Sequence, residues 1–158
     1  MRPSTIWVVL GEHSIGTDTE TDLTKWFAVK QIVVHKTKKG KASNTDIALL
    51  KLTEEIPLAT FTPICLPPPD FDIRGLNVTL SGWGLINCPN PSTNPWCTGG
   101  VPANTLQEID FPVPSHEVCK AATNNFGNGK VFCWGGEEGK SGCFGDSGSP
   151  LIHSINGQ

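Results

Sequence analysis

Apolar residues occur along this chain in short runs that are separated by longer polar segments rich in glycine and proline. Residues 5–10 and 27–34 are rich in Ile, Val, Trp and Phe and end in turn-prone or charged residues, which predicts two strands. Residues 46–52 follow a loop of Lys, Gly, Ser and Asn, and their continuous apolar run predicts a strand that is buried on both faces.

Prolines interrupt the middle of the chain. Residues 54–72 contain five prolines, which exclude a regular helix or a central strand and indicate a connector. Ser115 is a candidate N-cap, and it predicts one or two helical turns that end near residue 123. The remaining apolar runs are also short and predict strands at residues 78–83, 106–113, 131–133 and 150–155.

Composition narrows the class of protein. The 17 glycines and 13 prolines show no repeat, which is typical of an all-β sandwich or barrel with many turns. A length of 158 residues suits one ordinary domain. Twelve basic against fifteen acidic residues give a net charge of −3, and the only basic cluster, residues 36–41, is interpreted as a solvated loop. We therefore expect no nucleic-acid partner, and no apolar run is long enough for a membrane span.

The six cysteines indicate an oxidising compartment. None of them forms a CxxC pair or stands beside histidines at zinc-ligand spacing, so we expect disulfides and no metal. The sequon at Asn77 is compatible with secretion. No export signal is visible, because the apolar run at residues 6–10 is shorter than a signal-peptide core.

The segment from Cys143 to Leu151 carries the strongest chemical motif, Cys-Phe-Gly-Asp-Ser-Gly-Ser-Pro-Leu. Small neighbours leave the Ser147 hydroxyl accessible, and the glycines allow the backbone to direct several N–H groups at one point. Ser147 is therefore a candidate nucleophile, with an oxyanion hole formed by the N–H groups of Gly145 and Ser147. Taken alone, Gly-Asp-Ser-Gly is equally compatible with an ordinary turn.

The motif resembles that of the trypsin/chymotrypsin family of serine proteases, and the resemblance extends from residue 8 to residue 152. Further family landmarks follow in the family's order: Val-Leu-Gly-Glu-His at residues 9–13, Asp-Ile-Ala-Leu-Leu-Lys-Leu at 46–52, Ile-Cys-Leu-Pro at 64–67, Ser-Gly-Trp-Gly at 81–84 and Phe-Cys at 132–133. The resemblance implies an all-β fold of two antiparallel β-barrels of the chymotrypsin type. It is incomplete at both ends, with residues 1–56 from the N-terminal barrel, a connector at 57–76 and part of the C-terminal barrel at 77–158.

The resemblance also implies site residues. Asp46 corresponds to the triad acid, which would orient an imidazole and stabilise its protonated form. The family's Ala-His-Cys segment is absent from this sequence, and none of the four histidines (His13, His35, His116 and His153) stands at its place. We therefore expect the chain to be an internal fragment that neither folds stably nor hydrolyses peptides alone, with exposed strand edges that favour aggregation.

Specificity and activation follow from positions around the nucleophile. Ser141 corresponds to the floor of the S1 pocket, and a serine there implies an apolar P1 side chain of the chymotrypsin or elastase kind, because a basic P1 residue would need an aspartate. Asp146 corresponds to the residue that pairs with the new N-terminus after activation. Ser149 and Trp134 depart from the family's usual residues and change the pocket's surroundings.

For the cysteines, the resemblance implies a disulfide between Cys119 and Cys133 and a local one between Cys88 and Cys97. The partners of Cys65 and Cys143 lie, in relatives, outside the segment that corresponds to this chain.

The sequence therefore predicts a secreted, monomeric serine endopeptidase without a cofactor. Its partners are polypeptide substrates and protein protease inhibitors, and its chemistry proceeds through an acyl-enzyme. The alternative is a non-catalytic homologue that acts as a binding or decoy protein. An α/β-hydrolase is excluded, because its Gly-x-Ser-x-Gly motif requires glycine where this chain has Ser149.

Overall fold

The computed structural model describes residues 3–17, 20–35, 47–89, 93, 97–122, 132–135 and 139–155. The chain divides into two compact units, Met1–Leu66 and Pro67–Gln158. The strands pair antiparallel throughout the described residues, as the predicted all-β class requires. Asp46 lies outside the described residues.

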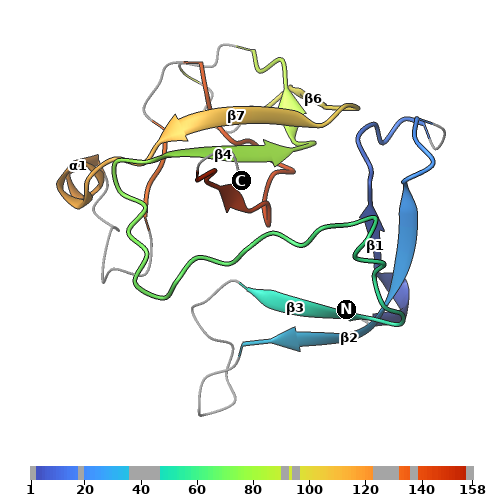
Figure 1. The fold of residues 1–158 in the computed structure, drawn as a ribbon. Coiled ribbons are helices and arrows are strands. Elements are labelled where there is room, and N and C mark those ends of the chain that lie inside the picture. The colour runs from blue at the N-terminus through green and yellow to red at the C-terminus, as the bar shows by residue number, and fades with distance from the viewer. Residues whose placement is uncertain are drawn as a thin grey trace. The chain divides into compact units, whose positions relative to one another are not determined.

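The first unit is built on a three-stranded sheet with the order β1-β2-β3 (Figure 1). A 3-10 turn, η1 (Pro3–Thr5), leads into β1 (Trp7–Leu10), and the other strands are β2 (Lys25–Val34) and β3 (Ala48–Leu52). The first part of β2 pairs with β1 and the rest with β3, and the register shifts between Val29 and Gln31. An extra residue of this kind bends a strand, and β2 changes direction between its two partners (Figure 1).

Two alternate residues of β2 form the buried centre of this unit. Phe27 and Val29 point to the same face and are both buried. The ring of Phe61 meets Phe27 edge-on, with the ring centroids 6.4 Å apart, so the residues after β3 fold back over the sheet.

The burial predicted for residues 46–52 is wrong for the described part of that segment. β3 forms as expected, but Leu49 is 68% exposed and Leu50 is 43% exposed. β3 is an edge strand that pairs only with β2 among the described strands, so its apolar side chains are not enclosed by a second layer.

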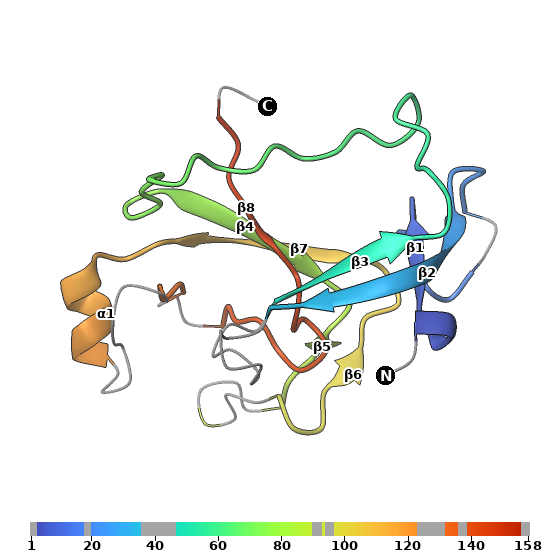
Figure 2. The same cartoon turned by 90° about the horizontal axis from the view of Figure 1, so that it is seen from below.

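The second unit has a three-stranded sheet with the order β7-β4-β8 and a two-stranded sheet of β5 and β6. Its strands are β4 (Asn77–Gly82), β5 (Leu85–Ile86), β6 (Val101–Pro102), β7 (Gln107–Pro112) and β8 (Leu151–Ile152). β4 alternates strictly, with Val78, Leu80 and Gly82 buried, which suits a central strand with one face on the core. β7 and β8 lie on either side of β4 (Figure 1), whereas the three strands overlap in the view from below (Figure 2).

The core of this unit collects side chains from β7, from the helix α1 (His116–Ala122) and from the loop after it. Phe111 and Val113 are almost wholly buried, and the ring of Trp134 lies 4.6 Å from that of Phe111. The helix begins after Ser115, whose hydroxyl accepts a 3.4 Å hydrogen bond from the Val118 N–H, as an N-cap residue should. Cys119 points inward and forms a disulfide with Cys133.

Two strand predictions are wrong in extent. In the segment 131–133, the described residues Phe132 and Cys133 lie in no strand, because Cys133 is held against α1 by the disulfide and not by a ladder. In the segment 150–155, only Leu151 and Ile152 pair, with Leu80 and Thr79 of β4. No helix in the described residues is long and apolar enough to cross a membrane.

Candidate active site

The loop that carries Ser147 is a pair of consecutive turns before β8. The Asp146 N–H donates to the Cys143 carbonyl at 3.1 Å, and the Ser149 N–H donates to the Asp146 carbonyl at 3.1 Å. Gly145 and Gly148 have φ values of 100° and 93°, which side chains with a Cβ rarely adopt. Glycine at these two positions therefore allows the chain to turn sharply on both sides of Ser147.

The Asp146 carboxylate fixes this loop to the end of β4. Its Oδ1 accepts a 2.9 Å hydrogen bond from the Gly84 N–H, and its Oδ2 accepts another of 2.9 Å from the Cys143 N–H. A second link runs from the Leu85 N–H to the Phe144 carbonyl at 2.9 Å. Hydrogen bonds to a carboxylate are stronger than those between neutral groups, so Asp146 positions the residues next to Ser147.

The glycines of the Ser-Gly-Trp-Gly segment make room for that carboxylate. A Cβ on Gly84 would lie 2.5 Å from Asp146 Cγ and from both carboxylate oxygens, and a Cβ on Gly82 would collide with Oδ1. The approach of the Ser147 loop to this strand end is therefore possible only because both positions lack a side chain.

Ser147 is exposed, and the nearby backbone donors are available. Within the part of the chain that the structure describes, the N–H groups of Gly145 and Ser147 donate to no protein acceptor. Exposed N–H groups next to a serine hydroxyl are what an oxyanion site requires.

Ser147 borders a cavity of about 640 Å³. Its walls include Ser141, and five of its eleven lining residues are aromatic or aliphatic, namely Leu80, Phe132, Trp134, Phe144 and Leu151. A mainly apolar hollow with a few polar groups is typical of small-molecule or side-chain binding sites. A smaller cavity of about 190 Å³, lined by Ser141, Asp146, Glu108 and apolar residues of β4 and β5, lies beside it.

Ser141 and Trp134 lie together in the larger cavity. The Ser141 hydroxyl donates to the Gly142 carbonyl at 3.0 Å, within its own turn. Gly142 is needed there, because a Cβ would come within 2.8 Å of the Trp134 ring and 2.9 Å of Leu80 Cδ2. Trp134 therefore packs directly over the backbone next to Ser141.

Among the described residues, no histidine that could serve as a general base lines this cavity. Of the two histidines in the second unit, neither His116 nor His153 lines it. The His153 Nδ1 atom lies 2.7 Å from the Asn77 carbonyl oxygen, and its ring contacts Phe71 with the centroids 6.4 Å apart. The predicted acid, Asp46, belongs to the first unit and lies outside the described residues.

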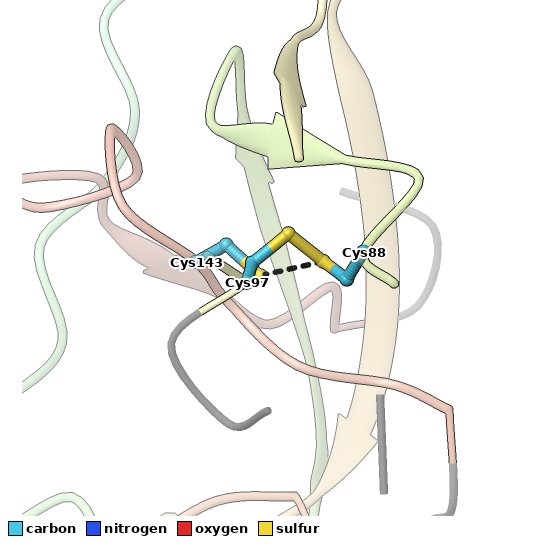
Figure 3. A group of neighbouring side chains, drawn as sticks. All are labelled: Cys88, Cys97 and Cys143. Atoms are coloured by element: carbon cyan, nitrogen blue, oxygen red, sulfur yellow. Dashed lines mark hydrogen bonds between the residues drawn. A yellow bond between two sulfur atoms is a disulfide. The ribbon is translucent and has the colours of Figure 1, made fainter. Parts of the chain in front are cut away.

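The structure contains both expected disulfides, Cys88–Cys97 (Figure 3) and Cys119–Cys133, and leaves Cys65 and Cys143 unpaired within this chain. Burial raises the pKa of the Cys143 thiol, and the nearby Asp146 carboxylate raises it further. The thiol is therefore protonated at neutral pH.

Sequence reasoning missed two parts of this arrangement. It used Gly82 and Gly84 only as family landmarks, although they receive the Asp146 carboxylate. It treated Trp134 as a departure from the family and not as a wall of the cavity. The repeated glycine of the Ser-Gly-Trp-Gly segment was the available signal, because glycine inside a strand end often marks close backbone approach.

Comparison with known proteins gives one consistent result. A family model described as "Trypsin" matches residues 2–157. The chain is 30% identical over 163 residues to "Chymotrypsin-like elastase family member 1" of Canis lupus familiaris, covering 99% of this chain and 58% of that protein. It is 32% identical over 162 residues to "Inactive CLIP domain-containing serine protease A3" of Aedes aegypti, covering 96% of this chain and 32% of that protein.

Among solved structures, one described as "Structure of GrC" superposes with a TM-score of 0.71 at 27% identity, covering 93% of this chain and 61% of that chain. The chain therefore spans less than two thirds of the length of these relatives.

Proposed function

The chain belongs to the trypsin family of serine proteases, and on that premise we propose that the whole protein that contains it is a serine endopeptidase with Ser147 as its nucleophile. The antiparallel β-structure agrees with the chymotrypsin-type fold of its structural neighbour. The observation that carries the proposal is the loop of Ser147, in which an exposed hydroxyl stands beside two N–H groups that donate to no acceptor in the described residues and beside a cavity with aromatic walls.

In the proposed reaction, Ser147 Oγ attacks the carbonyl carbon of a peptide bond and forms a tetrahedral intermediate. The N–H groups of Gly145 and Ser147 donate hydrogen bonds to the negative oxygen. The proton of the Ser147 hydroxyl passes to the imidazole that Asp46 would orient and from there to the leaving nitrogen. Collapse then expels the amine of the leaving peptide and leaves an acyl-enzyme, which water hydrolyses. Asp146 acts as a positioning residue, because its two hydrogen bonds fix the turn on which those donors stand.

Asp46 is proposed as the acid that orients the catalytic imidazole. No histidine of this chain is assigned as the general base.

A fluorophosphonate probe tests the nucleophile, because it reacts covalently only with an activated serine. The natively expressed protein should be labelled at Ser147, and Ser147→Ala should abolish the labelling. Ser149→Ala is the matched control, since it removes a neighbouring hydroxyl on the same loop and should keep the labelling. Absence of labelling in the native protein would refute the proposal.

The cavity supports a preference for apolar P1 side chains. Its walls of Trp134, Phe132 and Leu151 would bury an apolar group, and Ser141 offers no charge to pair with Lys or Arg. Values of kcat/KM for matched peptides with Phe, Ala or Arg at P1 distinguish a preference for apolar side chains from a preference for basic ones. Faster cleavage after Arg would contradict the assignment, whereas Ser141→Asp should move the preference toward Arg.

A non-catalytic binding protein is the second candidate. It is favoured by the similarity to a relative named inactive and by the absence of a histidine at the described cavity. The fluorophosphonate experiment decides between the two, because a binding protein without an activated serine would remain unlabelled while retaining the fold.

The setting proposed for either activity is extracellular. Two disulfides within 158 residues suit an oxidising compartment. Polypeptide substrates and protein protease inhibitors are the proposed partners, and the protein is proposed to act as a monomer.

A further inference from the structure

The sequon Asn77-Val78-Thr79 forms the start of β4, and the proposed peptidase activity makes no use of it. Asparagine followed by any residue except proline and then by serine or threonine is the acceptor for N-linked glycans in exported proteins. The sequence has one other triplet with this spacing, Asn90-Pro91-Ser92, and the proline at its centre excludes it. Asn77 is therefore the candidate acceptor of this chain.

Asn77 is exposed, and the alternation of side chains along β4 explains why. Val78, Leu80 and Gly82 are buried on the core side of the strand. Successive side chains of a strand point to opposite faces, so the side chain of Asn77 lies with that of Thr79 on the outer face. The acceptor amide and the hydroxyl that the sequon requires are thus both on the side of β4 that faces away from the core.

The neighbouring strands leave this face open at Asn77. In β7, Pro112 lies opposite Asn77 and Asp110 lies opposite Thr79, and both of these β7 residues are exposed. On the other side of β4, the pairing with β8 in the described residues involves Thr79 and Leu80 and does not extend to Asn77. The described strands therefore do not enclose the Asn77 side chain.

Hydrogen bonds hold the backbone around Asn77. Its carbonyl oxygen lies 2.7 Å from Nδ1 of His153. Just before it, the Gly75 N–H donates to the Val113 carbonyl at 2.8 Å, and the Leu76 carbonyl accepts from the Val113 N–H at 2.9 Å. These contacts use backbone atoms of residues 75–77, so a group attached to the Asn77 side chain would displace none of them.

We propose that Asn77 is N-glycosylated in the exported protein, with an oligosaccharide linked to a lipid pyrophosphate as the donor. The Asn77 Nδ2 atom attacks the anomeric carbon of the first sugar and forms an N–C bond. The bond from that carbon to the pyrophosphate oxygen breaks, its electron pair leaves with the lipid pyrophosphate, and Nδ2 gives up one proton. The side chain remains an amide, so no oxidant or reductant is consumed.

The transfer must precede the completion of the sheet. In the folded chain the Thr79 hydroxyl donates to Asp110 Oδ1 at 2.6 Å. Thr79 also lies in the ladder between β7 and β8, opposite Asp110 and Ile152. An enzyme that reads the sequon therefore has to meet this segment before β4 pairs, and folding then carries the sugar to the outer face.

The attachment point lies at the other end of β4 from the Ser147 loop. β4 begins at the end of the sheet nearest α1 and runs away from it (Figure 1), and five steps of about 3.3 Å separate Asn77 from Gly82. A glycan at Asn77 would cover the outer face of β4 and β7 and leave the cavity beside Ser147 open. The proposal rests on the proposed extracellular setting and not on Ser147 being a nucleophile.

Peptide mapping tests the proposal on the whole protein that contains this chain, expressed in cells with an oligosaccharyltransferase and collected from the medium. The protein is digested before and after treatment in H₂¹⁸O with a peptide N-glycosidase, which converts a glycosylated asparagine to ¹⁸O-labelled aspartate. We expect this conversion at position 77, and Asn90 should stay unchanged. Unmodified Asn77 in the secreted protein would overturn the proposal. Retention of the protein in the cytosol would overturn it together with the extracellular setting.

Four variants separate the sequon from the fold. Asn77→Gln and Thr79→Ala should lose the glycan completely, whereas Thr79→Ser keeps the sequon and should remain glycosylated. Asp110→Ala is the matched control for Thr79→Ala, because each removes the hydrogen bond between these two side chains and only the change at Thr79 destroys the sequon. A glycan that persists in Thr79→Ala, or one that is lost in Asp110→Ala, would contradict recognition of the sequon.

A variant that fails to fold still gives a result, because the transfer precedes folding. Protein retained in the cells is compared by gel mobility before and after treatment with the glycosidase. Asp110→Ala should show the mobility shift even when it is retained, and Thr79→Ala should not. The same mobility shift in both retained variants would overturn the proposal.

Discussion

Asp72 and Arg74 show how a single exposed pair can shift a titration. The guanidinium donates from Nε at 2.7 Å and from Nη2 at 2.6 Å to the two carboxylate oxygens, and the Arg74 N–H adds a third hydrogen bond. The side-chain hydrogen bonds from Arg74 lower the pKa of Asp72 from 3.8 to about 2. Because the folded pKa is depressed, the pair contributes stability above pH 4 that is lost as the pH falls toward 2.

Arg74→Met should raise the pKa of Asp72 part of the way toward 3.8, because the side-chain hydrogen bonds are lost while the backbone N–H of residue 74 still donates to the carboxylate. Carboxyl ¹³C chemical shifts recorded between pH 1.5 and pH 6 measure this directly. Lys120→Met is the matched control, because it removes one positive charge from exposed α1 and should leave the Asp72 titration in place. Equal shifts in both variants would mean that net charge and not the hydrogen-bonded pair sets the pKa.

Phe111 is the largest fully buried side chain among the described residues. It is 0% exposed and its ring lies 4.6 Å from that of Trp134. In the whole protein, Phe111→Ala should lower the free energy of unfolding by about 3–5 kcal/mol, from lost burial and the cavity left behind. Urea unfolding measures the change. Phe132→Ala, at a position 44% exposed, should cost less than half as much, and similar losses would show that the core lies elsewhere.

At the scale of elements, the segment after β4 that contains Gly84 and the Ser147 loop are joined by the hydrogen bond from the Gly84 N–H to Asp146. Gly84→Ala places a methyl group where the Asp146 carboxylate lies and should displace the turn with its donors. A displacement of about 1 Å at a reacting group can lower a rate on the order of 10²-fold. The rate of fluorophosphonate labelling at Ser147 measures this effect, and the prediction rests on the proposed function.

Gly75→Asn is the control for that substitution. Gly75 has a φ of 79°, no heavy atom lies within 4 Å of the point that a Cβ would occupy, and asparagine tolerates this conformation better than most residues. Labelling should therefore remain near that of the unchanged protein. If the Gly84→Ala protein is labelled equally fast, Asp146 does not position Ser147 for reaction.

At the scale of the whole molecule, apolar surface on the first unit predicts association at high protein concentration, beyond the conditions in which the protein is proposed to act as a monomer. Leu49 is 68% exposed on β3, which is an edge strand in the described sheet. Exposed apolar edges pair with other chains, and a lysine on such an edge opposes that pairing. Leu49→Lys should reduce the apparent mass at high concentration while changing the free energy of unfolding by less than about 0.5 kcal/mol.

Sedimentation velocity over a range of concentrations measures this change. Lys51→Leu is the reverse variant on the same strand, and it should increase the association. If the unchanged protein, Leu49→Lys and Lys51→Leu show the same apparent mass, the chains do not associate through β3.

The sequence by itself determined the elements that a local pattern can encode. Short runs rich in apolar residues located β2 and β4, because β-branched and aromatic residues suit the half-buried surface of a sheet. The proline-rich segment after residue 54 has no regular element in the structure, since proline lacks the N–H that helices and ladders use. The motif around Ser147 and the other landmarks also led to the family that the comparison with known proteins found.

Only the tertiary structure decided which distant groups meet. Asp146 receives its hydrogen bond from Gly84, 62 positions away, and Cys143 reaches Cys88 across 55. The two-residue strands β5 and β6 are too short to leave a periodic signal, and the exposure of β3 depends on what packs on the sheet and not on its own apolar residues. Contacts of this range depend on the entropy of closing long loops and on the space that other segments leave. A short run of residues determines neither of them.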